Sequence, residues 1–171
     1  EVLDLVPVRK ETKLFLGGTV QLFEQPEFQQ VEQARTVFGL LEEHDRLITV
    51  LRKAVSEIAK DFGHDYYVAK SLGGEKSSEL WQAVGKQGFL GVNIAEQYGG
   101  GGGGIYDMQI VGEELAAAGC PLLMTVVSPT ICGTIIEAFG SDELKARWLP
   151  GIASGEIIMA FAITEPDAGS N

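Results

Sequence analysis

The chain has 171 residues, of which 45% are hydrophobic, and its 24 acidic and 13 basic side chains give a formal net charge of -11. This length and apolar content suit a soluble domain with a real core, and the acidic balance disfavours nucleic acid and anionic membrane surfaces as partners. Because no apolar run is long enough to span a membrane and no signal peptide begins the chain, we expect a cytoplasmic protein, or a mitochondrial matrix protein if the source is eukaryotic.

Residues 1–41 carry short apolar clusters and a stretch rich in Gln and Glu, and their role stays open. One interpretation is an arm that packs on another subunit or on a further part of the polypeptide. From Glu42 to Phe62, apolar residues recur at helical spacing, which predicts an amphipathic helix that Gly63 ends. Its predicted inner face consists of Leu47, Ile48, Leu51, Val55, Ile58, Ala59 and Phe62.

Two further helices are predicted before residue 120. Ser77 or Ser78 can cap the first of them, because Ser is a preferred N-cap residue. Its inner face is expected to contain Leu80, Trp81 and Val84. The other runs from about Ile105 to Ala118 with Gly119 as its stop. Its inner face is expected to contain Ile105, Met108, Val111 and Leu115.

Six consecutive glycines occupy Gly99–Gly104. A phosphate cradle needs a strand before the glycines, a helix N-terminus after them and a Lys or an acidic partner at a fixed distance. That frame is missing here. We therefore interpret the glycines as a compliant surface loop that joins two helices.

Residues 122–139 are apolar on nearly every side and are predicted to be the most buried element. Ser128 and Pro129 form a helix start signal, which predicts a short helix ending near Val127 and another from Pro129 to Gly140. A final helix is predicted over residues 142–149, where Pro150 and Gly151 stop it.

The apolar run Ile157–Ile163 predicts a buried strand, and the turn formers of residues 164–170 follow it. Pro166 holds Glu165 in an extended conformation, so the strand should end there. Such a loop can offer main-chain N–H groups and hydroxyls to an anion or to the polar edge of a planar ring. An ordinary strand exit fits the same residues, and both interpretations stay open at this point.

The metal-binding and thiol side chains form no site. Cys120 and Cys132 fit no metal spacing and are interpreted as buried, reduced thiols. His44 and His64 likewise belong to no ligand pattern. No metal ion is expected.

Beside these observations, the segment Phe161–Asn171 resembles a signature of the acyl-CoA dehydrogenase family, aromatic-Ala-x-Thr-Glu-Pro-x-Ala-Gly-Ser-Asp. Every position agrees except the last, where Asn171 replaces the usual Asp and removes a carboxylate. The resemblance extends upstream to residue 42 with motifs in the family's order. These are Gly88-Phe89-Leu90-Gly91-Val92, Glu96-Gln97-Tyr98-Gly99-Gly100, Glu113-Glu114-Leu115-Ala116 and the helix Phe139–Pro150.

The resemblance implies a mainly α fold, namely the N-terminal helical bundle of an acyl-CoA dehydrogenase, ending in the first strand of the β domain. The expected domains are residues 1–41, an extension of unknown role, residues 42–154, the helical domain, and residues 155–171, the start of the domain that contacts FAD. In the family the rest of the flavin site follows this signature, so we expect it beyond Asn171.

The resemblance also implies FAD-dependent dehydrogenation of acyl-CoA thioesters to trans-2-enoyl-CoA. No catalytic residue is expected here, because the family's glutamate base lies in the C-terminal helical domain, and this excludes Glu165. The residues implied to bind FAD are Phe161, Ala162, Ile163, Thr164, Gly169 and Ser170. The residues implied to contact the acyl-CoA substrate are Thr125, Ser128, Thr130 and again Ser170.

The implied partners are the acyl-CoA substrate, an electron-transfer flavoprotein as electron acceptor, and further copies of the chain in a homo-oligomer. Two other functions stay open. The chain can be a non-catalytic helical interaction module, or its relatives can be acyl-CoA oxidases or flavin monooxygenases.

Overall fold

The computed structural model describes the backbone of residues 27–169. Solvent exposure is described for residue 39 and for residues 42–169. The chain divides into two compact units, residues 1–46 and residues 47–171. Most of the expected N-terminal extension lies outside the described residues. Helix α1 (Glu27–Lys60) nevertheless begins well before the predicted start at Glu42, so residues 27–41 of that extension are helical.

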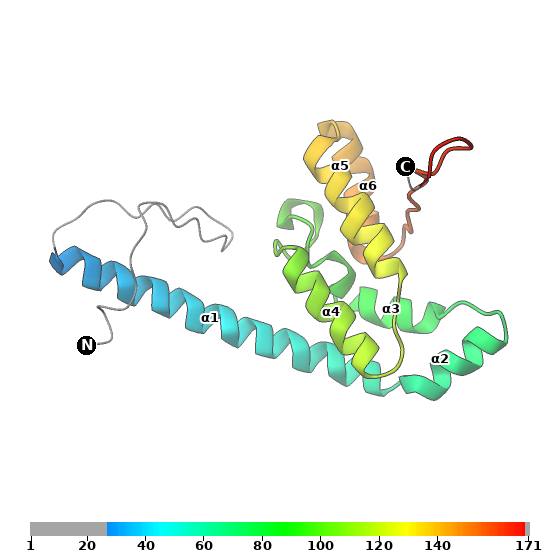
Figure 1. Ribbon diagram of the computed structural model, residues 1–171, viewed down its shortest axis with the longest axis horizontal. Coiled ribbons are helices and arrows are strands. Elements are labelled where there is room, and N and C mark those ends of the chain that lie inside the picture. Colours follow the sequence, from blue (N-terminus) through cyan, green and yellow to red (C-terminus); the bar gives the residue numbers. More distant parts are fainter. Residues whose placement is uncertain (1–26, 170–171) are drawn as a thin grey trace. The chain divides into compact units, whose positions relative to one another are not determined.

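The predicted mainly α class is confirmed, since the described residues form helices and no strand. Figure 1 shows their order by colour and places α5 beside α6. After α1 the elements are α2 (Gly63–Leu72), α3 (Ser78–Lys86), the 3-10 turns η2 (Phe89–Gly91) and η3 (Glu96–Tyr98), α4 (Ile105–Ala117), the π-helix η4 (Val126–Gly133), α5 (Thr134–Phe139) and α6 (Asp142–Ser154).

The main core of the second unit is built from α1, α3 and α4, as their periodicity predicts. Its buried residues include Val55, Ala59, Leu80, Trp81, Val84, Met108, Val111 and Leu115. Two predicted core positions are wrong, because Leu47 is 54% exposed and Ile105 is 58% exposed. Leu47 is the first residue of the second unit, and Ile105 lines a cavity instead of the core.

Helix α1 ends at Lys60, shortly before the predicted stop at Gly63, which is instead the first residue of α2. The φ of Gly63 is +70°, the left-handed conformation that glycine adopts without strain. The next helix, α2, was not predicted. None of its residues is buried, so it carries no strong apolar periodicity that a sequence pattern can detect.

The six glycines form a surface loop that joins η3 to α4, as predicted, but the prediction that this loop is compliant is wrong. The N–H groups of Gly101, Gly102 and Gly103 donate to the carbonyls of Gly91, Ile94 and Val92 at 2.8–2.9 Å. A Cβ on Gly100 would overlap the Ile94 carbonyl group. The glycines are therefore needed for close approach of two backbone segments.

The predicted helix break at Ser128 and Pro129 is also wrong, because the chain stays helical from residue 124 to residue 139. Pro129 offers no N–H to the Thr125 carbonyl four residues earlier, and its ring would crowd that carbonyl in an α-helix. The π-helix η4 widens the turn at this place, and the Thr130 hydroxyl donates to the Thr125 carbonyl at 2.9 Å. The Asn93 amide donates to the Pro129 carbonyl at 3.0 Å.

Helix α6 passes through Pro150, which was predicted to stop it, and continues to Ser154. Ile152 and Ala153 in the added turn are buried in a second core cluster, which offsets the hydrogen bond that Pro150 cannot donate. Gly155, with a φ of +80°, ends the helix.

The predicted strand at residues 157–163 is not formed in the described part of the chain. A strand needs a neighbouring strand to pair its main-chain groups, and the only bridge among residues 27–169 joins Glu165 and Ala168 within one turn. The segment instead attaches to helices. The Ile157 N–H donates to the Gly151 carbonyl at 2.9 Å, and Met159 packs on the second core cluster.

Candidate functional site

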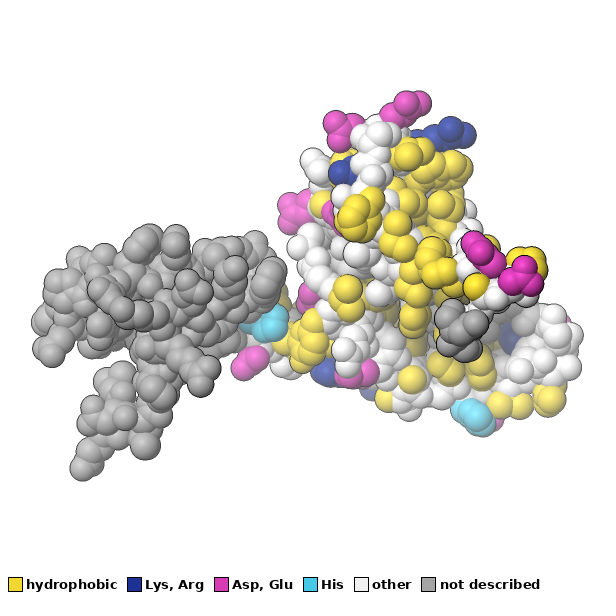
Figure 2. Space-filling model, turned by 45° about the horizontal axis from the view of Figure 1, so that its top comes forward, with side chains coloured by type: hydrophobic (Ala, Val, Ile, Leu, Met, Phe, Trp, Pro, Cys, Tyr) yellow, Lys and Arg dark blue, Asp and Glu magenta, His cyan; other side chains and the backbone are white. Residues whose placement is uncertain are grey.

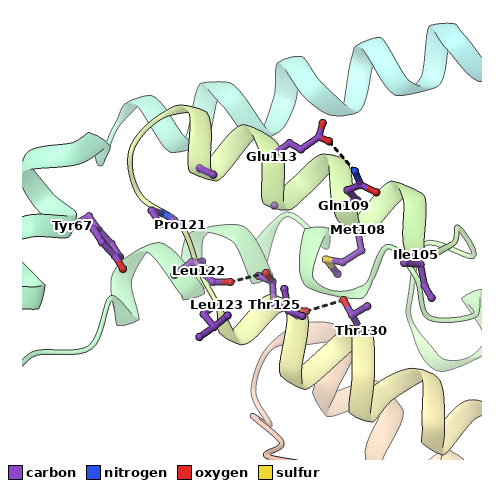
Figure 3. Close-up of a pocket in the computed structure, with 13 residues that line it drawn as sticks. Tyr67, Ile105, Met108, Gln109, Glu113, Pro121, Leu122, Leu123, Thr125 and Thr130 are labelled. Carbon is purple, nitrogen blue, oxygen red and sulfur yellow. Dashed lines mark hydrogen bonds between the residues drawn. The ribbon is translucent and has the colours of Figure 1, made fainter. Parts of the chain in front are cut away.

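An apolar cavity of about 570 Å³ lies between α4 and the segment that leads into η4. Figure 3 shows the lining side chains in a row, from Tyr67 of α2 at one end to Ile105 at the start of α4 at the other. The lining residues are Tyr67, Ile105, Met108, Gln109, Gly112, Glu113, Ala116, Pro121, Leu122, Leu123, Thr125, Val126 and Thr130. None of these is a Lys or an Arg, so the cavity suits an apolar group.

Two of the predicted substrate-contacting residues, Thr125 and Thr130, line this cavity. Their hydroxyls are used within the helix. Thr125 Oγ1 donates to the Leu122 carbonyl at 2.6 Å, and Thr130 Oγ1 donates to the Thr125 carbonyl at 2.9 Å. Both bonds are drawn in Figure 3. With their donors satisfied, the two threonines offer mainly methyl groups and acceptor lone pairs to the cavity.

Polar groups on α4 lie along one edge of the cavity. The Gln109 amide donates to Glu113 Oε1 at 3.0 Å, and Arg52 of α1 donates to Glu113 at 2.7 Å and to Glu114 at 2.8 Å. The hydrogen bonds from Arg52 and then Gln109 hold the pKa of Glu113 below its usual range. This edge therefore stays ionised at neutral pH and is fixed to α1.

The third predicted substrate-contacting residue, Ser128, does not line the cavity. Its side chain is fully buried, and its Oγ accepts a hydrogen bond from the Met159 N–H at 3.0 Å. Ser128 thus ties η4 to the segment that continues into residues 161–169, where the predicted flavin contacts lie.

The predicted flavin-contacting residues within 161–169 are exposed. Phe161 is 45% exposed, Ile163 is 70% exposed, and Ala162, Thr164 and Gly169 are exposed as well. Beyond Thr164 the chain folds back in a turn, in which the Glu165 N–H donates to the Ala168 carbonyl at 2.9 Å and the Ala168 N–H donates back at 3.3 Å. Ser170 and Asn171 lie outside the described residues.

Hydrophobic side chains reach the surface over a broad area of the second unit (Figure 2). A large exposed apolar area in a soluble protein marks a surface that another molecule or another part of the polypeptide covers. The exposed large residues of η4, α5 and the last segment are Val126, Ile135, Phe139, Ile158, Phe161 and Ile163.

A second cavity, of about 910 Å³, adjoins the first and is more polar. Lys76 and Lys86 line it with the hydroxyls of Ser77 and Ser78. The Trp81 indole N–H, also at this cavity, donates to the Gly155 carbonyl at 2.9 Å. Four residues border both cavities, and these are Tyr67, Pro121, Leu122 and Leu123.

The contribution of α4 and α2 to the cavity was not predicted from the sequence. Met108, Gly112 and Ala116 follow one another at intervals of four residues and so share one face of α4. The available sequence signal was Gly112, a small residue within an apolar face. In the structure the space beside Gly112 is open, because a Cβ built there meets nothing within 4 Å. Tyr67 gave no such signal, because α2 itself was not predicted.

The remaining side-chain predictions concern metals and thiols. Cys120 and Cys132 are buried and unpaired as predicted, and burial raises the pKa of both thiols. Within residues 27–169, no group of His, Cys, Asp and Glu side chains is arranged to hold a metal ion. No helix in the described part of the chain is long and apolar enough to cross a membrane.

Comparison with known families gives a match to the profile described as "Acyl-CoA dehydrogenase, N-terminal domain" over residues 42–156, which is more than half of the chain. A second profile, "HrcA protein C terminal domain", matches residues 1–80, which is less than half. The helices and both cavities described above fall mainly within the first match.

Among curated proteins, the chain is 61% identical over 121 residues to acyl-CoA dehydrogenase FadE12 of Mycobacterium tuberculosis, covering 71% of this chain and 31% of the relative. It is 37% identical over 129 residues to the mitochondrial long-chain specific acyl-CoA dehydrogenase of Sus scrofa, covering 75% of this chain and 29% of the relative. The chain thus spans less than a third of the length of these relatives.

Among solved structures, butyryl-CoA dehydrogenase from Megasphaera elsdenii has a TM-score of 0.57 and 26% identity, covering 70% of this chain and 33% of that one. The helical fold is therefore shared with an acyl-CoA dehydrogenase of known structure.

Proposed function

The chain belongs to the acyl-CoA dehydrogenase family, and we propose that it supplies one wall of the flavin site and of the acyl site in an FAD-dependent acyl-CoA dehydrogenase. The proposed reaction converts an acyl-CoA thioester to the trans-2-enoyl-CoA. The observation that carries this proposal is the apolar cavity at Thr125 and Thr130, together with the hydrogen bond from Met159 that ties the neighbouring Ser128 to the signature segment.

The residues of the signature segment fit a flavin. A flavin has a flat apolar ring with one polar edge. Phe161 and Ile163 offer exposed apolar side chains, and Thr164 offers an exposed hydroxyl. The two apolar side chains can pack on the flat ring, and the hydroxyl can hydrogen-bond to its polar edge. We assign the flavin contacts to these residues and to Ala162, Gly169 and Ser170, as the family resemblance implies.

FAD, when bound, supplies the acceptor for the two electrons that leave the acyl chain. The task of this chain is to orient the substrate and exclude water. The cavity beside α4 is the proposed place of the acyl tail, because its lining is mainly apolar apart from the edge at Gln109 and Glu113, and each buried methylene contributes about 0.8 kcal/mol. Ile105 and Ala116, which both line the cavity, lie about 16 Å apart along the axis of α4. An extended acyl chain spans about 1.2 Å per bond, so the length of the acyl tail can be compared with this distance.

The proton at the α-carbon needs a base, and we assign none in this chain. Glu165 is exposed, its main chain closes a tight turn with Ala168, and it lines neither of the two cavities. The proposal places the base in a later part of the full-length protein. The proposed acceptor for the reduced flavin is an electron-transfer flavoprotein, the proposed assembly is a homo-oligomer, and the proposed location is the cytoplasm, or the mitochondrial matrix in a eukaryote.

The test uses the full-length flavin-loaded protein. Under anaerobic conditions, addition of a saturated acyl-CoA should bleach the flavin absorbance, and the trans-2-enoyl-CoA should form in equal amount. Slow reoxidation by oxygen then supports a dehydrogenase. Fast reoxidation with production of hydrogen peroxide would identify an oxidase, and an unbleached flavin across all chain lengths would refute the proposal.

A further inference from the structure

Tyr67 occupies a distinct place among the residues that border the two cavities. Pro121, Leu122 and Leu123 are consecutive residues of one loop, whereas Tyr67 comes from α2. In Figure 3 its ring stands at one end of the row of lining side chains, apart from the side chains of α4. Tyr67 is therefore the one side chain outside that loop, among the described residues, that separates the apolar cavity from the polar one.

Helix α2 lies at the surface of the second unit. No residue of α2 is buried, and positive-φ glycines, Gly63 and Gly74, lie at its two ends. The polar contacts of the helix lie on its other residues. Tyr66 Oη donates to Glu79 at 2.7 Å, and Lys70 pairs with Glu75 and Glu79 at 2.9 Å each. These exposed pairs hold α2 to its surroundings only weakly.

Tyr67 itself is half-buried against the main core. Its neighbour Tyr66 also packs on that core but lines neither cavity. Residues 66 and 67 thus differ in one respect that matters here, which is contact with the cavities. This pair provides a variant and a matched control of the same size, helix and degree of burial.

From this arrangement we infer that Tyr67 determines the length of the acyl chain that the apolar cavity accepts, by closing the end of the cavity toward Lys76 and Lys86. The inference rests on the proposed function, since it names a specificity residue for the same substrate. A chain that reaches Tyr67 meets an aromatic wall. A longer chain must displace the ring or enter a cavity whose cations and hydroxyls do not favour methylenes.

The test measures how affinity depends on chain length in the full-length protein. Dissociation constants are determined by calorimetry for a series of straight-chain acyl-CoAs and for the free fatty acids. Each methylene that is buried should lower the dissociation constant about four-fold. The constant should stop falling at the length where the chain reaches Tyr67. In Tyr67→Ala this plateau should move to longer chains, and in Tyr67→Trp to shorter ones.

Tyr66→Ala is the matched control and should keep the wild-type plateau, although it loses a comparable core contact and the Glu79 hydrogen bond. An identical plateau in wild type and both Tyr67 variants would overturn the inference, and so would an equal shift in Tyr66→Ala. The fatty acid series needs no turnover. If the protein binds the series but bleaches with no acyl-CoA, the proposed function fails while the inference on Tyr67 is still decided.

Discussion

The Ser128 hydroxyl oxygen, fully buried in η4, accepts a hydrogen bond at 3.0 Å from the main-chain N–H of Met159. The two residues are far apart in the sequence, and this bond joins the helix beside the apolar cavity to the segment that carries the family signature. A single side chain therefore connects the proposed acyl wall with the proposed flavin wall. Ser128 was predicted to contact the substrate, but its hydroxyl instead bonds the main chain of Met159.

Replacement of Ser128 by Ala should loosen the segment that follows Met159. The change leaves the Met159 N–H without its acceptor, which costs about 1 kcal/mol in the free energy of unfolding. Hydrogen exchange at the Met159 amide should speed up, and FAD affinity of the full-length protein should fall. Ser71→Ala removes an exposed hydroxyl of α2, away from this segment, and serves as the control. Equal exchange rates at Met159 in both variants would count against the positioning role.

The hydroxyl of Thr130 should be needed for the π-helix. Thr130→Val keeps the shape of the side chain but removes the hydrogen bond that the hydroxyl donates to the Thr125 carbonyl, beside the i→i+5 bond of the π-helix. We expect a loss of about 1 kcal/mol in the free energy of unfolding, measured by urea denaturation. Thr130→Ser retains the donor and should lose much less. If the two variants are equally stable, this hydrogen bond does not contribute to the free energy of unfolding.

Two glycines should respond in opposite ways to the same substitution. Gly100→Ala forces a Cβ against the Ile94 carbonyl and should destabilise the protein by about 1–3 kcal/mol. Gly112→Ala adds a Cβ in open space within α4 and should stabilise it by up to about 1 kcal/mol. Thermal unfolding of the two variants beside wild type checks both signs. A tolerated Gly100→Ala would restore the interpretation of the glycine run as a compliant loop.

The hydrogen bonds from Lys70 and Tyr66 lower the pKa of Glu79 from 4.5 to about 2. A lowered carboxyl pKa contributes stability above the unfolded-state pKa, and that contribution is lost as pH falls through the folded-state pKa. Wild type should therefore be more stable than Glu79→Gln at pH 7. The difference should begin to shrink below about pH 4.5.

Unfolding midpoints between pH 7 and pH 3 test this, with Glu57→Gln, an exposed carboxylate of α1, as the control. A difference between wild type and Glu79→Gln that stays constant over that range would contradict the assignment. High salt should also narrow the difference at pH 7, because the pairs of Lys70 are exposed and salt screens them.

The sequence predicted most of what periodicity can report. The inner face of α3, that of α4 apart from Ile105, the stop at Gly119 and the burial of both cysteines are confirmed. The two wrong predictions at prolines share a physical cause, because other interactions compensate a local helix-breaking signal. At Pro129 the chain widens into a π-helix in which the Thr130 hydroxyl also bonds the Thr125 carbonyl, and at Pro150 the burial of Ile152 favours a longer α6.

Only some of the residues that line the cavity could be predicted from the sequence. Thr125 and Thr130 stand out as polar residues in an apolar run, and they do line it. Gly112 and Tyr67 do not stand out, because a cavity is defined by what several elements leave unfilled. The flavin contacts stay predictions from the resemblance, and the strand that was expected to carry them needs partner strands that residues 27–169 do not provide.

The central claim, that the cavity beside α4 holds the acyl tail, is tested most directly by Gly112→Leu in the full-length enzyme. The Leu side chain would fill the cavity from a position where a Cβ meets nothing within 4 Å. The measurement is kcat/KM for butyryl-CoA and for long-chain acyl-CoAs, with Ala117→Leu, an exposed α4 position outside the cavity, as the control. We predict that Gly112→Leu loses long-chain activity at least ten-fold, about 1.4 kcal/mol, while butyryl-CoA activity and the control are unchanged. Equal chain-length profiles in wild type, Gly112→Leu and Ala117→Leu would contradict the account.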